Sequence, residues 1–195
     1  MKIIRHRRNT IEQLQATSPK LGIEVDIRSY GSDLIIHHDP FVKGELFLEW
    51  IKHFKHKTLI LNVKEEGLEE RLLNTMKENN IKDFYFLDQS FPFLIKTAKT
   101  GESRCAVRVS EYESIDTALS LAGQIDWVWV DCFNHFPLNQ TTASQLKHAG
   151  FKLCLVSPEL QGRMEYSQII AMRQLLEQEN IKVDAVCTKY PEQWQ

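Results

Sequence analysis

Short apolar runs rich in β-branched residues recur along the whole chain, and amphipathic segments separate them. The runs occupy residues 2–5, 22–27, 58–63, 83–87, 104–109, 127–132, 152–156 and 183–188. This alternation indicates βα units rather than hairpins. Eight such units predict an α/β fold, a compact single-domain (β/α)8 TIM barrel, although an open doubly wound sheet uses the same local units.

The segments between the runs carry apolar residues every three or four positions, which is the spacing of one helix face. They predict helices at 10–18, 45–53, 68–76, 93–100, 115–122, 141–149 and 169–176. A strand-like extension at 34–37 follows the second run after a turn. No linker, low-complexity tract or repeat interrupts the series, so residues 1–195 are expected to form one domain.

The charge balance argues against large anionic partners. With 24 basic and 26 acidic residues the formal charge is -2, so no global field would attract nucleic acid or an anionic membrane. No segment has the ~20 apolar residues of a membrane span, and the first residues lack the apolar stretch of a signal peptide. A cytoplasmic protein is therefore expected. The sequence does not fix an oligomeric state.

The four cysteines have no CxxC spacing. Cys105, Cys132, Cys154 and Cys187 each lie within or at the end of an apolar run. A reduced thiol in such a place acts as a small hydrophobic group, so we expect buried free thiols rather than disulfides or a zinc site.

Polar residues gather where the predicted strands end. In a (β/α)8 barrel the carboxyl ends of all strands form one face, so these residues can belong to one site. The main candidates are His6, Arg7, Glu24, Asp26, His38, Asn62, Lys64, Arg108, Asp131 and Glu159.

Glu24 and Asp26 lie two positions apart in one strand, so both side chains point to the same face and Val25 points to the other. If that face is the barrel interior, mutual repulsion raises one carboxyl pKa unless a cation lies between them. Mg²⁺ or Ca²⁺ is the natural neutraliser, because both prefer oxygen ligands. The alternative is that both acids lie on a solvated edge strand.

His6 and His38 come from different strand ends, and either imidazole could serve as a general acid or base. Arg7 could bind a phosphate oxygen through its guanidinium, and Asp39 could orient the ring of His38. Taken singly, each histidine is more often a surface or hydrogen-bonded structural residue than a catalytic one.

Four motifs together resemble the glycerophosphodiester phosphodiesterase family, namely His6-Arg7, Asn9-Thr10, Glu24-Val25-Asp26 and His38-Asp39-Pro40. The last strand and its tail, at 183–191, resemble the closing strand of the family. The resemblance implies a (β/α)8 fold and metal-dependent hydrolysis of a small-molecule glycerophosphodiester to an alcohol and a phosphomonoester, glycerol phosphate. In the family a neighbouring substrate hydroxyl is thought to attack first, and water then completes hydrolysis.

The resemblance also implies a role for each matching residue. His6 and His38 would be the acid/base pair, and Arg7 and Lys64 would hold the phosphate. Glu24 and Asp26 would bind a divalent cation, Mg²⁺ or Ca²⁺. Asn62 would be a weak third ligand, because it stands where the family usually has a glutamate and an amide oxygen brings no charge.

The sequence departs from the family pattern in further places. Arg8 stands where a glycine usually follows the His-Arg pair. Asn9-Thr10 lies several residues closer to that pair than the matching motif does in the family. Only residues 41–57 separate the His-Asp motif from the third strand, so the family's usual insertion is expected to be absent and the site more open. Lys189 replaces an aspartate of the family's tail.

Two alternatives to this function follow. The chain could be a degenerate, non-catalytic barrel that binds a phosphorylated ligand or a partner, or a phosphodiesterase for another lipid or sugar diester. In the second case Arg108, Asp131 and Glu159 would line a polar substrate pocket. Trp127 and Trp129 share one face of their strand, and we expect that face to pack against the helices.

Overall fold

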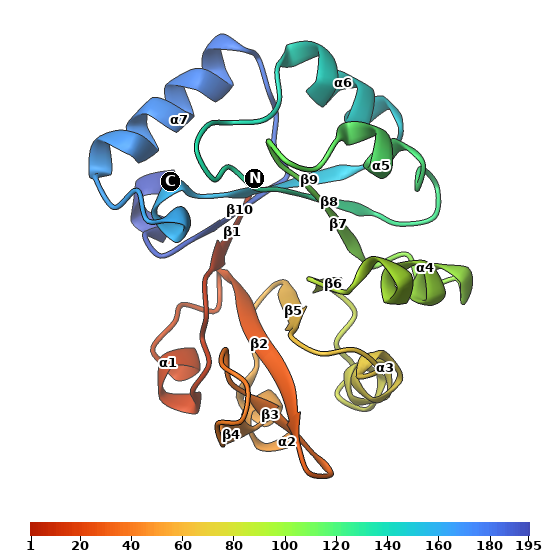
Figure 1. Ribbon diagram of the computed structural model, residues 1–195. Coiled ribbons are helices and arrows are strands. Elements are labelled where there is room, and N and C mark those ends of the chain that lie inside the picture. The colour runs from red at the N-terminus through yellow and green to blue at the C-terminus, as the bar shows by residue number, and fades with distance from the viewer.

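The computed structural model covers residues 1–195 and has eight parallel strands that curl into a barrel-like sheet (Figure 1). The parallel strands are β1 (Lys2–Arg5), β2 (Gly22–Tyr30), β5 (Leu59–Val63), β6 (Phe84–Leu87), β7 (Ala106–Val109), β8 (Trp127–Val130), β9 (Lys152–Val156) and β10 (Ala185–Thr188). Each predicted strand is present, most of them a residue or two shorter than expected, while β2 runs three residues further.

Neighbouring strands pair in the order β6-β5-β2-β1-β10-β9-β8-β7. The two ends of this series meet at one isolated parallel bridge, between Phe86 of β6 and Cys105 beside β7. The extra length of β2 pairs antiparallel with β3 (Asp33–Ile36), which in turn pairs with β4 (Glu45–Leu46). The predicted extension after the second strand therefore forms a hairpin with β2. Between β6 and β7 the sheet is held by a single bridge.

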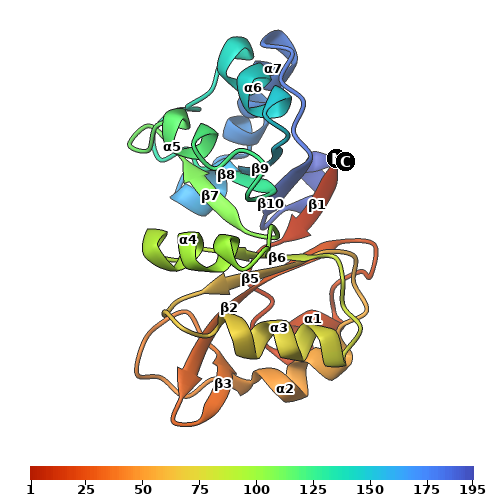
Figure 2. The same cartoon turned by 90° about the vertical axis from the view of Figure 1, so that its right-hand side faces the viewer.

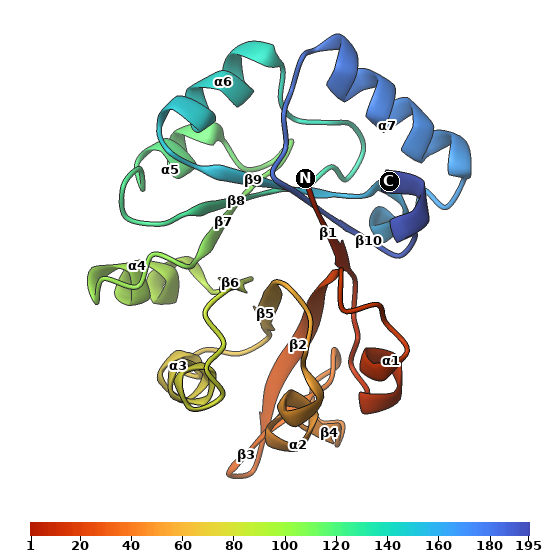
Figure 3. The same cartoon turned by 180° about the vertical axis from the view of Figure 1, so that it is seen from behind.

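Helices cover the outer face of the sheet (Figures 1 and 3). They are α1 (Ile11–Gln15), α2 (Phe47–Trp50), α3 (Glu69–Glu78), α4 (Phe91–Lys99), α5 (Ile115–Leu119), α6 (Gln140–His148) and α7 (Tyr166–Gln178), with short 3-10 turns at Ile51–His53, Pro158–Gln161 and Pro191–Trp194. No full helix follows β10. Strand β1 pairs with β10, so the first strand of the chain lies beside the last one (Figure 2).

The core has two parts. The larger, of 40 buried residues, lies between the strands and the helices. The smaller, of 11 residues that all belong to strands, fills the inside of the barrel. Small side chains such as Ala106, Ala185 and Cys187 leave room there for larger ones.

Trp127 and Trp129 belong to the inner cluster, so the expectation that they face the helices is wrong. The ring of Trp127 stacks on Tyr85 at 4.5 Å between centroids. Period-two alternation places both tryptophans on one face, but it does not say which face is the interior. A second correction concerns 45–53, where the predicted single helix begins as strand β4.

The four cysteines are free and buried, as expected. Burial raises the pKa of Cys105 and of Cys154 to about 12, so both thiols stay protonated at neutral pH. None of the helices has the length and apolar character needed to cross a lipid bilayer.

Candidate active site

The carboxyl ends of β1, β2 and β5 bring together the residues of the predicted site. Glu24 and Asp26 are both fully buried on the inner face of β2, whereas Val25 packs in the outer core. In the parallel register Asp26 lies opposite Asn62 of β5. The two acids therefore occupy the barrel interior and not a solvated edge.

Glu24 is held by two donors. The backbone N–H of Arg7 donates to Oε2 at 2.7 Å, and the Nδ2 of Asn62 donates to Oε1 at 2.8 Å. Burial, followed by the charge of Asp26, raises the pKa of Glu24 to about 7. The ionised form of Glu24 is therefore disfavoured in this place.

Asp26 is surrounded by polar groups of the chain itself. Asn9 pairs with it twice, because Asn9 Nδ2 donates to Oδ2 at 2.8 Å and the Asp26 N–H donates to Asn9 Oδ1 at 3.1 Å. Arg7 Nε lies 3.3 Å from Oδ2, and Lys64 Nζ lies 3.4 Å from Oδ1. Both residues expected to hold a phosphate thus lie against Asp26. Arg7 reaches this place with a left-handed backbone, at a φ of 47°.

His6 lies beside the same acids. Its side chain is 13% exposed, and Nε2 is 3.8 Å from Glu24 Oε2. Burial, followed by the nearby charges of Arg7 and Lys189, lowers the pKa of His6 to about 3. The imidazole is therefore neutral at physiological pH.

His38 lies further out, with 45% of its side chain exposed. Its Nδ1 is 2.8 Å from Asp39 Oδ1, so Nε2 remains available for a ligand. The hydrogen bond of the adjacent His37 N–H to the Asp26 carbonyl, at 3.2 Å, holds this segment near the acids. The expected orientation of the ring by Asp39 is present.

Arg28 was missed in the sequence, although it links both halves of the site. Its guanidinium donates to the His38 carbonyl at 2.9 and 3.0 Å and to the Lys64 carbonyl at 3.1 Å. These bonds fix the backbone of an expected acid/base residue relative to that of an expected phosphate ligand. Arg28 lies near the C-terminal end of β2, and an arginine in that position gives no sequence signal that it links two parts of a site.

Arg8 stabilises the loop after β1. Its side chain turns back and donates twice to the His6 carbonyl, at 3.0 and 3.1 Å. Trp50 Nε1 donates to the Arg8 carbonyl at 2.9 Å. The guanidinium therefore braces the backbone of His6.

An ion-pair network extends the site toward β7 and β8. Lys64 Nζ donates to Asp88 Oδ2 at 3.1 Å, and Arg108 bridges Asp88 and Asp131. Burial acts to raise the pKa of Asp88, but the charges of Arg108 and Lys64 outweigh it and lower that pKa. Burial raises the pKa of Asp131, whose Oδ1 accepts from Gln161 Nε2 at 2.6 Å. The structure thus brings Arg108 and Asp131 together and joins them to Lys64 through Asp88.

Glu159 is placed differently from these residues. It is 1% exposed and accepts from the Thr188 hydroxyl at 2.6 Å, from the Lys189 N–H at 2.8 Å and from Ser157. Three donors of the chain therefore occupy its carboxylate, which ties the turn after β9 to the end of β10.

Glu111 fixes the rim of this face and was not assigned a structural role in the sequence. Its carboxylate accepts the backbone N–H groups of Phe133, Asn134 and His135 at 2.6–3.1 Å. Burial opposes ionisation, but these hydrogen bonds outweigh it and lower the pKa of Glu111 to about 2.

Substitution Glu111→Ala should therefore loosen the loop after β8 and lower the free energy of unfolding by about 1–3 kcal/mol. Because the folded pKa lies below the ordinary value, this contribution is present above pH 4.5 and is lost as pH falls toward 2. Urea unfolding at pH 7 and pH 3 measures both effects. An equal loss at the two pH values would contradict the role of the ionised carboxylate.

The donor set around Glu24 and Asp26 can be tested against a divalent cation. No three His, Cys, Asp or Glu side chains are close enough to hold a metal by themselves. The Oδ1 atoms of Asp26 and Asn62 are buried and accept no hydrogen bond. Two carboxylates and one amide oxygen suit Mg²⁺, which commonly binds one or two carboxylates and completes its shell with water and substrate oxygens. The residues present therefore fit such an ion.

Comparison with known proteins shows which solved structures share this architecture. No protein-family model matches the sequence, and no curated protein matches it. Solved structures that match include a glycerophosphodiester phosphodiesterase from Agrobacterium tumefaciens, with 11% identity and a TM-score of 0.68, and a glycerophosphoryl diester phosphodiesterase from Parabacteroides distasonis, with 13% identity and a TM-score of 0.69. The chain has the fold of these phosphodiesterases.

The alignments extend over nearly the whole barrel. The first covers 100% of this chain and 98% of that chain, and the second covers 98% and 84%. A mutant tryptophan synthase α-subunit from Pyrococcus furiosus also matches, with 11% identity, a TM-score of 0.61 and coverage of 98% and 88%. Proteins with different activities share this barrel, so the structural similarity establishes the architecture only. The reaction depends on the residues of the site. It agrees with the family resemblance of the motifs around His6, Glu24 and His38.

Proposed function

We propose that this protein is a metal-dependent phosphodiesterase that hydrolyses a glycerophosphodiester to an alcohol and glycerol phosphate. The observation that carries the proposal is the convergence of His6, Arg7 and Lys64 on two buried carboxylates. Such a convergence of a base, cations and oxygen ligands at a barrel mouth suits phosphoryl transfer.

The residues divide into roles by charge and exposure. Arg7 and Lys64 would bind the phosphate oxygens and stabilise the charge that builds on them. Neutral His6 would accept the proton of the attacking glycerol hydroxyl, and exposed His38, oriented by Asp39, would protonate the leaving alcohol as its bond to phosphorus breaks. Water would then open the resulting cyclic diester, giving one proton to His38 while His6 returns its proton to the released glycerol oxygen, and the product is glycerol phosphate. Phosphate binding would draw Arg7 and Lys64 away from Asp26.

Glu24, Asp26 and Asn62 would hold the divalent cation, Mg²⁺ or Ca²⁺. When bound, the ion would act as a Lewis acid on a phosphate oxygen. It would also supply the positive charge that lets both carboxylates ionise at neutral pH.

The test is release of phosphomonoester from a panel of glycerophosphodiesters with Mg²⁺, Ca²⁺ or EDTA. We expect turnover that needs the metal and is lost in His38→Ala. The matched control is His148→Ala, since His148 is exposed on α6 and bonds only within that helix. No turnover of any diester, with no metal binding by the folded protein, would refute the proposal.

The alternative of a non-catalytic barrel rests on Asn62 and on the ion pairs of Asp26. An amide replaces a charged ligand, and two cations of the chain already balance the Asp26 charge. The same polar groups could then bind a phosphorylated ligand without turnover. Metal binding discriminates the two functions, because only the enzyme needs it.

Substitution Asn62→Glu should raise the affinity for Mg²⁺ by about tenfold or more, since a third carboxylate adds charge to the donor set. In the metal-free protein it should raise the pKa of Glu24 further and lower stability. Isothermal titration calorimetry measures the affinity. Asn62→Gln keeps the amide and is the control; an unchanged affinity in Asn62→Glu would place the ion elsewhere.

A further inference from the structure

Lys189 lies beside His6 at the mouth of the barrel. It follows Thr188, the last residue of β10, and the His6 N–H donates to the Thr188 carbonyl at 3.0 Å. Ile4 and Cys187 belong to the inner core, so the next inward positions on their strands are His6 and Lys189. Both side chains therefore leave the sheet on its inner face, next to the proposed phosphate site.

The backbone of Lys189 is held from both sides. Its N–H donates to Glu159 Oε1 at 2.8 Å, and its carbonyl accepts from the guanidinium of Arg5. The next N–H, of Tyr190, donates to the Thr188 hydroxyl at 2.9 Å. None of these bonds involves the lysine side chain, so they fix the point from which it leaves the strand and would persist after its substitution.

The ammonium group of Lys189 has no partner within the chain. The half-buried side chain forms no ion pair with an acid and donates no hydrogen bond. Burial, then Arg7 and then Lys189 lower the pKa of His6, so the charge of Lys189 reaches the imidazole. Two more cations lie here without an acid, but Arg5 and Arg8 bond to the carbonyls of Lys189 and His6. The lysine, in contrast, has all three of its donors free.

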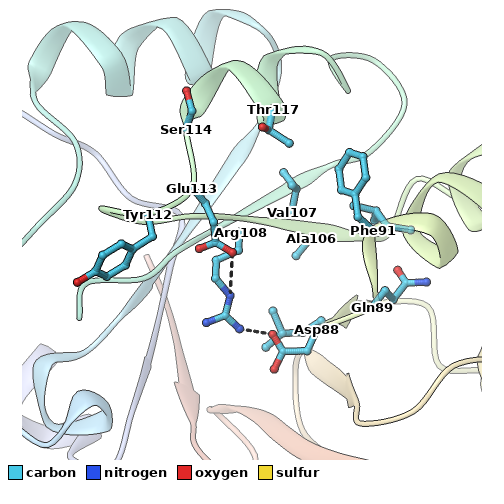
Figure 4. Close-up of a pocket in the computed structure, with 12 residues that line it drawn as sticks. Asp88, Gln89, Phe91, Ala106, Val107, Arg108, Tyr112, Glu113, Ser114 and Thr117 are labelled. Carbon is cyan, nitrogen blue, oxygen red and sulfur yellow. Dashed lines mark hydrogen bonds and ion pairs between the residues drawn. The ribbon is translucent and has the colours of Figure 1, made fainter.

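The other cations of the barrel mouth already lie against acids. Arg7 Nε and Lys64 Nζ lie 3.3 and 3.4 Å from the two carboxylate oxygens of Asp26. Arg108 bonds to Asp88, as Figure 4 shows, and Asp88 also accepts from Lys64 at 3.1 Å. The charges of these three cations are therefore balanced within the chain.

A single phosphodiester does not use all the positive charge of the site. In the proposed complex, Glu24 and Asp26 balance the divalent cation, and Arg7 balances the one charge of the diester phosphate. Lys64 keeps a counter-ion in the ion-pair network. The charge of Lys189 is then left over, and a half-buried ammonium beside other cations is unfavourable until an anion neutralises it. Lysine is a common ligand of phosphate.

The strand order decides which arm of the substrate meets Lys189. Strands β10, β1 and β2 lie side by side in this order, and the segment that carries His38 follows β3, beyond β2 (Figure 1). Lys189 therefore lies on the side of His6 that is away from His38. Because His6 is the proposed base for the glycerol hydroxyl and His38 the proposed acid for the leaving alcohol, Lys189 faces the glycerol unit.

We propose that Lys189 binds a second phosphate on the glycerol unit of the substrate. The protein would then select glycerophosphodiesters whose glycerol carries a further phosphate. The inference rests on the proposed phosphodiesterase function and deepens it by naming the class of substrate.

The first test is isothermal titration calorimetry with glycerol bisphosphate, which has a phosphate on each terminal carbon, and with glycerol monophosphate, in the presence of Mg²⁺. We expect the wild type to bind the bisphosphate about tenfold more tightly, the effect of one charge-assisted hydrogen bond. Lys189→Met and Lys189→Gln should remove this preference, and Lys189→Arg should keep it. The matched control is Lys20→Met, which removes an exposed lysine ahead of β2 at the opposite end of the barrel and should bind as the wild type does.

Two results would overturn the second phosphate site. Equal affinity of the wild type for both ligands would do so and leave the hydrolase intact. An equal loss of affinity for both ligands in the neutral variants would place Lys189 on the shared phosphate instead. A preference that depends on Lys189, in a protein that hydrolyses no diester, would support the site and refute the proposed reaction.

Hydrolysis gives the second test. The value of kcat/KM for a diester with a phosphorylated glycerol should exceed that for the plain glycerol diester about tenfold in the wild type, and the two should be equal in Lys189→Met. Turnover of both diesters with equal kcat/KM in the wild type would overturn the inference and leave the phosphodiesterase function in place.

Discussion

Substitution His6→Asn is expected to lower kcat for phosphodiester hydrolysis by about 10²–10⁴-fold, the usual contribution of a general base. The imidazole lies beside Glu24, with Nε2 at 3.8 Å from Oε2, and is 13% exposed. Steady-state kinetics on the best diester of the panel measures the loss. His53→Asn, an exposed histidine on the 3-10 turn after α2, should retain full activity.

The pH profile adds a second readout of the same role. Because the pKa of His6 is about 3, protonation of His6 should cause no loss of kcat/KM between pH 8 and pH 5. A base whose pKa were near its ordinary value of 6.5 would give a tenfold fall for each pH unit below it. A kcat in His6→Asn within about threefold of the wild type would contradict the assignment of His6 as the base.

Substitution Glu24→Gln is expected to abolish metal-dependent activity and, at the same time, to stabilise the metal-free protein at pH 8. The folded pKa of Glu24 is about 7, above the ordinary 4.5, so the folded state holds its proton more tightly than the unfolded state. The contribution of Glu24 to stability should therefore be highest below pH 4.5 and be lost as the pH rises through about 7. The fall is at most roughly 3 kcal/mol, the free energy of such a shift.

Thermal unfolding with EDTA between pH 5 and pH 8 checks this prediction. The neutral amide that Glu24→Gln introduces should remove most of the pH dependence, and a turned Asn62 amide could accept its N–H. Added Mg²⁺ should stabilise the wild type most at pH 8 and should not affect Glu24→Gln. Glu177→Gln is the control and should follow the wild-type curve. A Glu24→Gln protein that is less stable than the wild type at pH 8 would show that Glu24 is not strained by its burial.

The local pattern of the sequence predicted the strands and the paired acids well. Alternation placed Glu24 and Asp26 on one face, and their full burial on the inner side of β2 confirms it. The same reasoning failed for Trp127 and Trp129, because alternation defines two faces and only the closure of the sheet decides which of them is inside. Small residues on other strands, such as Ala106 and Cys187, leave room for these rings.

The sequence by itself determined the α/β architecture, the buried thiols and the group of polar residues at the strand ends, because each of these depends on short-range periodicity or on position along a strand. The tertiary structure decided which of those residues meet. Arg28, Asn9 and Asp88 contact the expected site residues through side chains that lie 10 to 24 positions away in the chain. No local pattern encodes such contacts, since they arise only when the strands lie side by side and their carboxyl ends share one face.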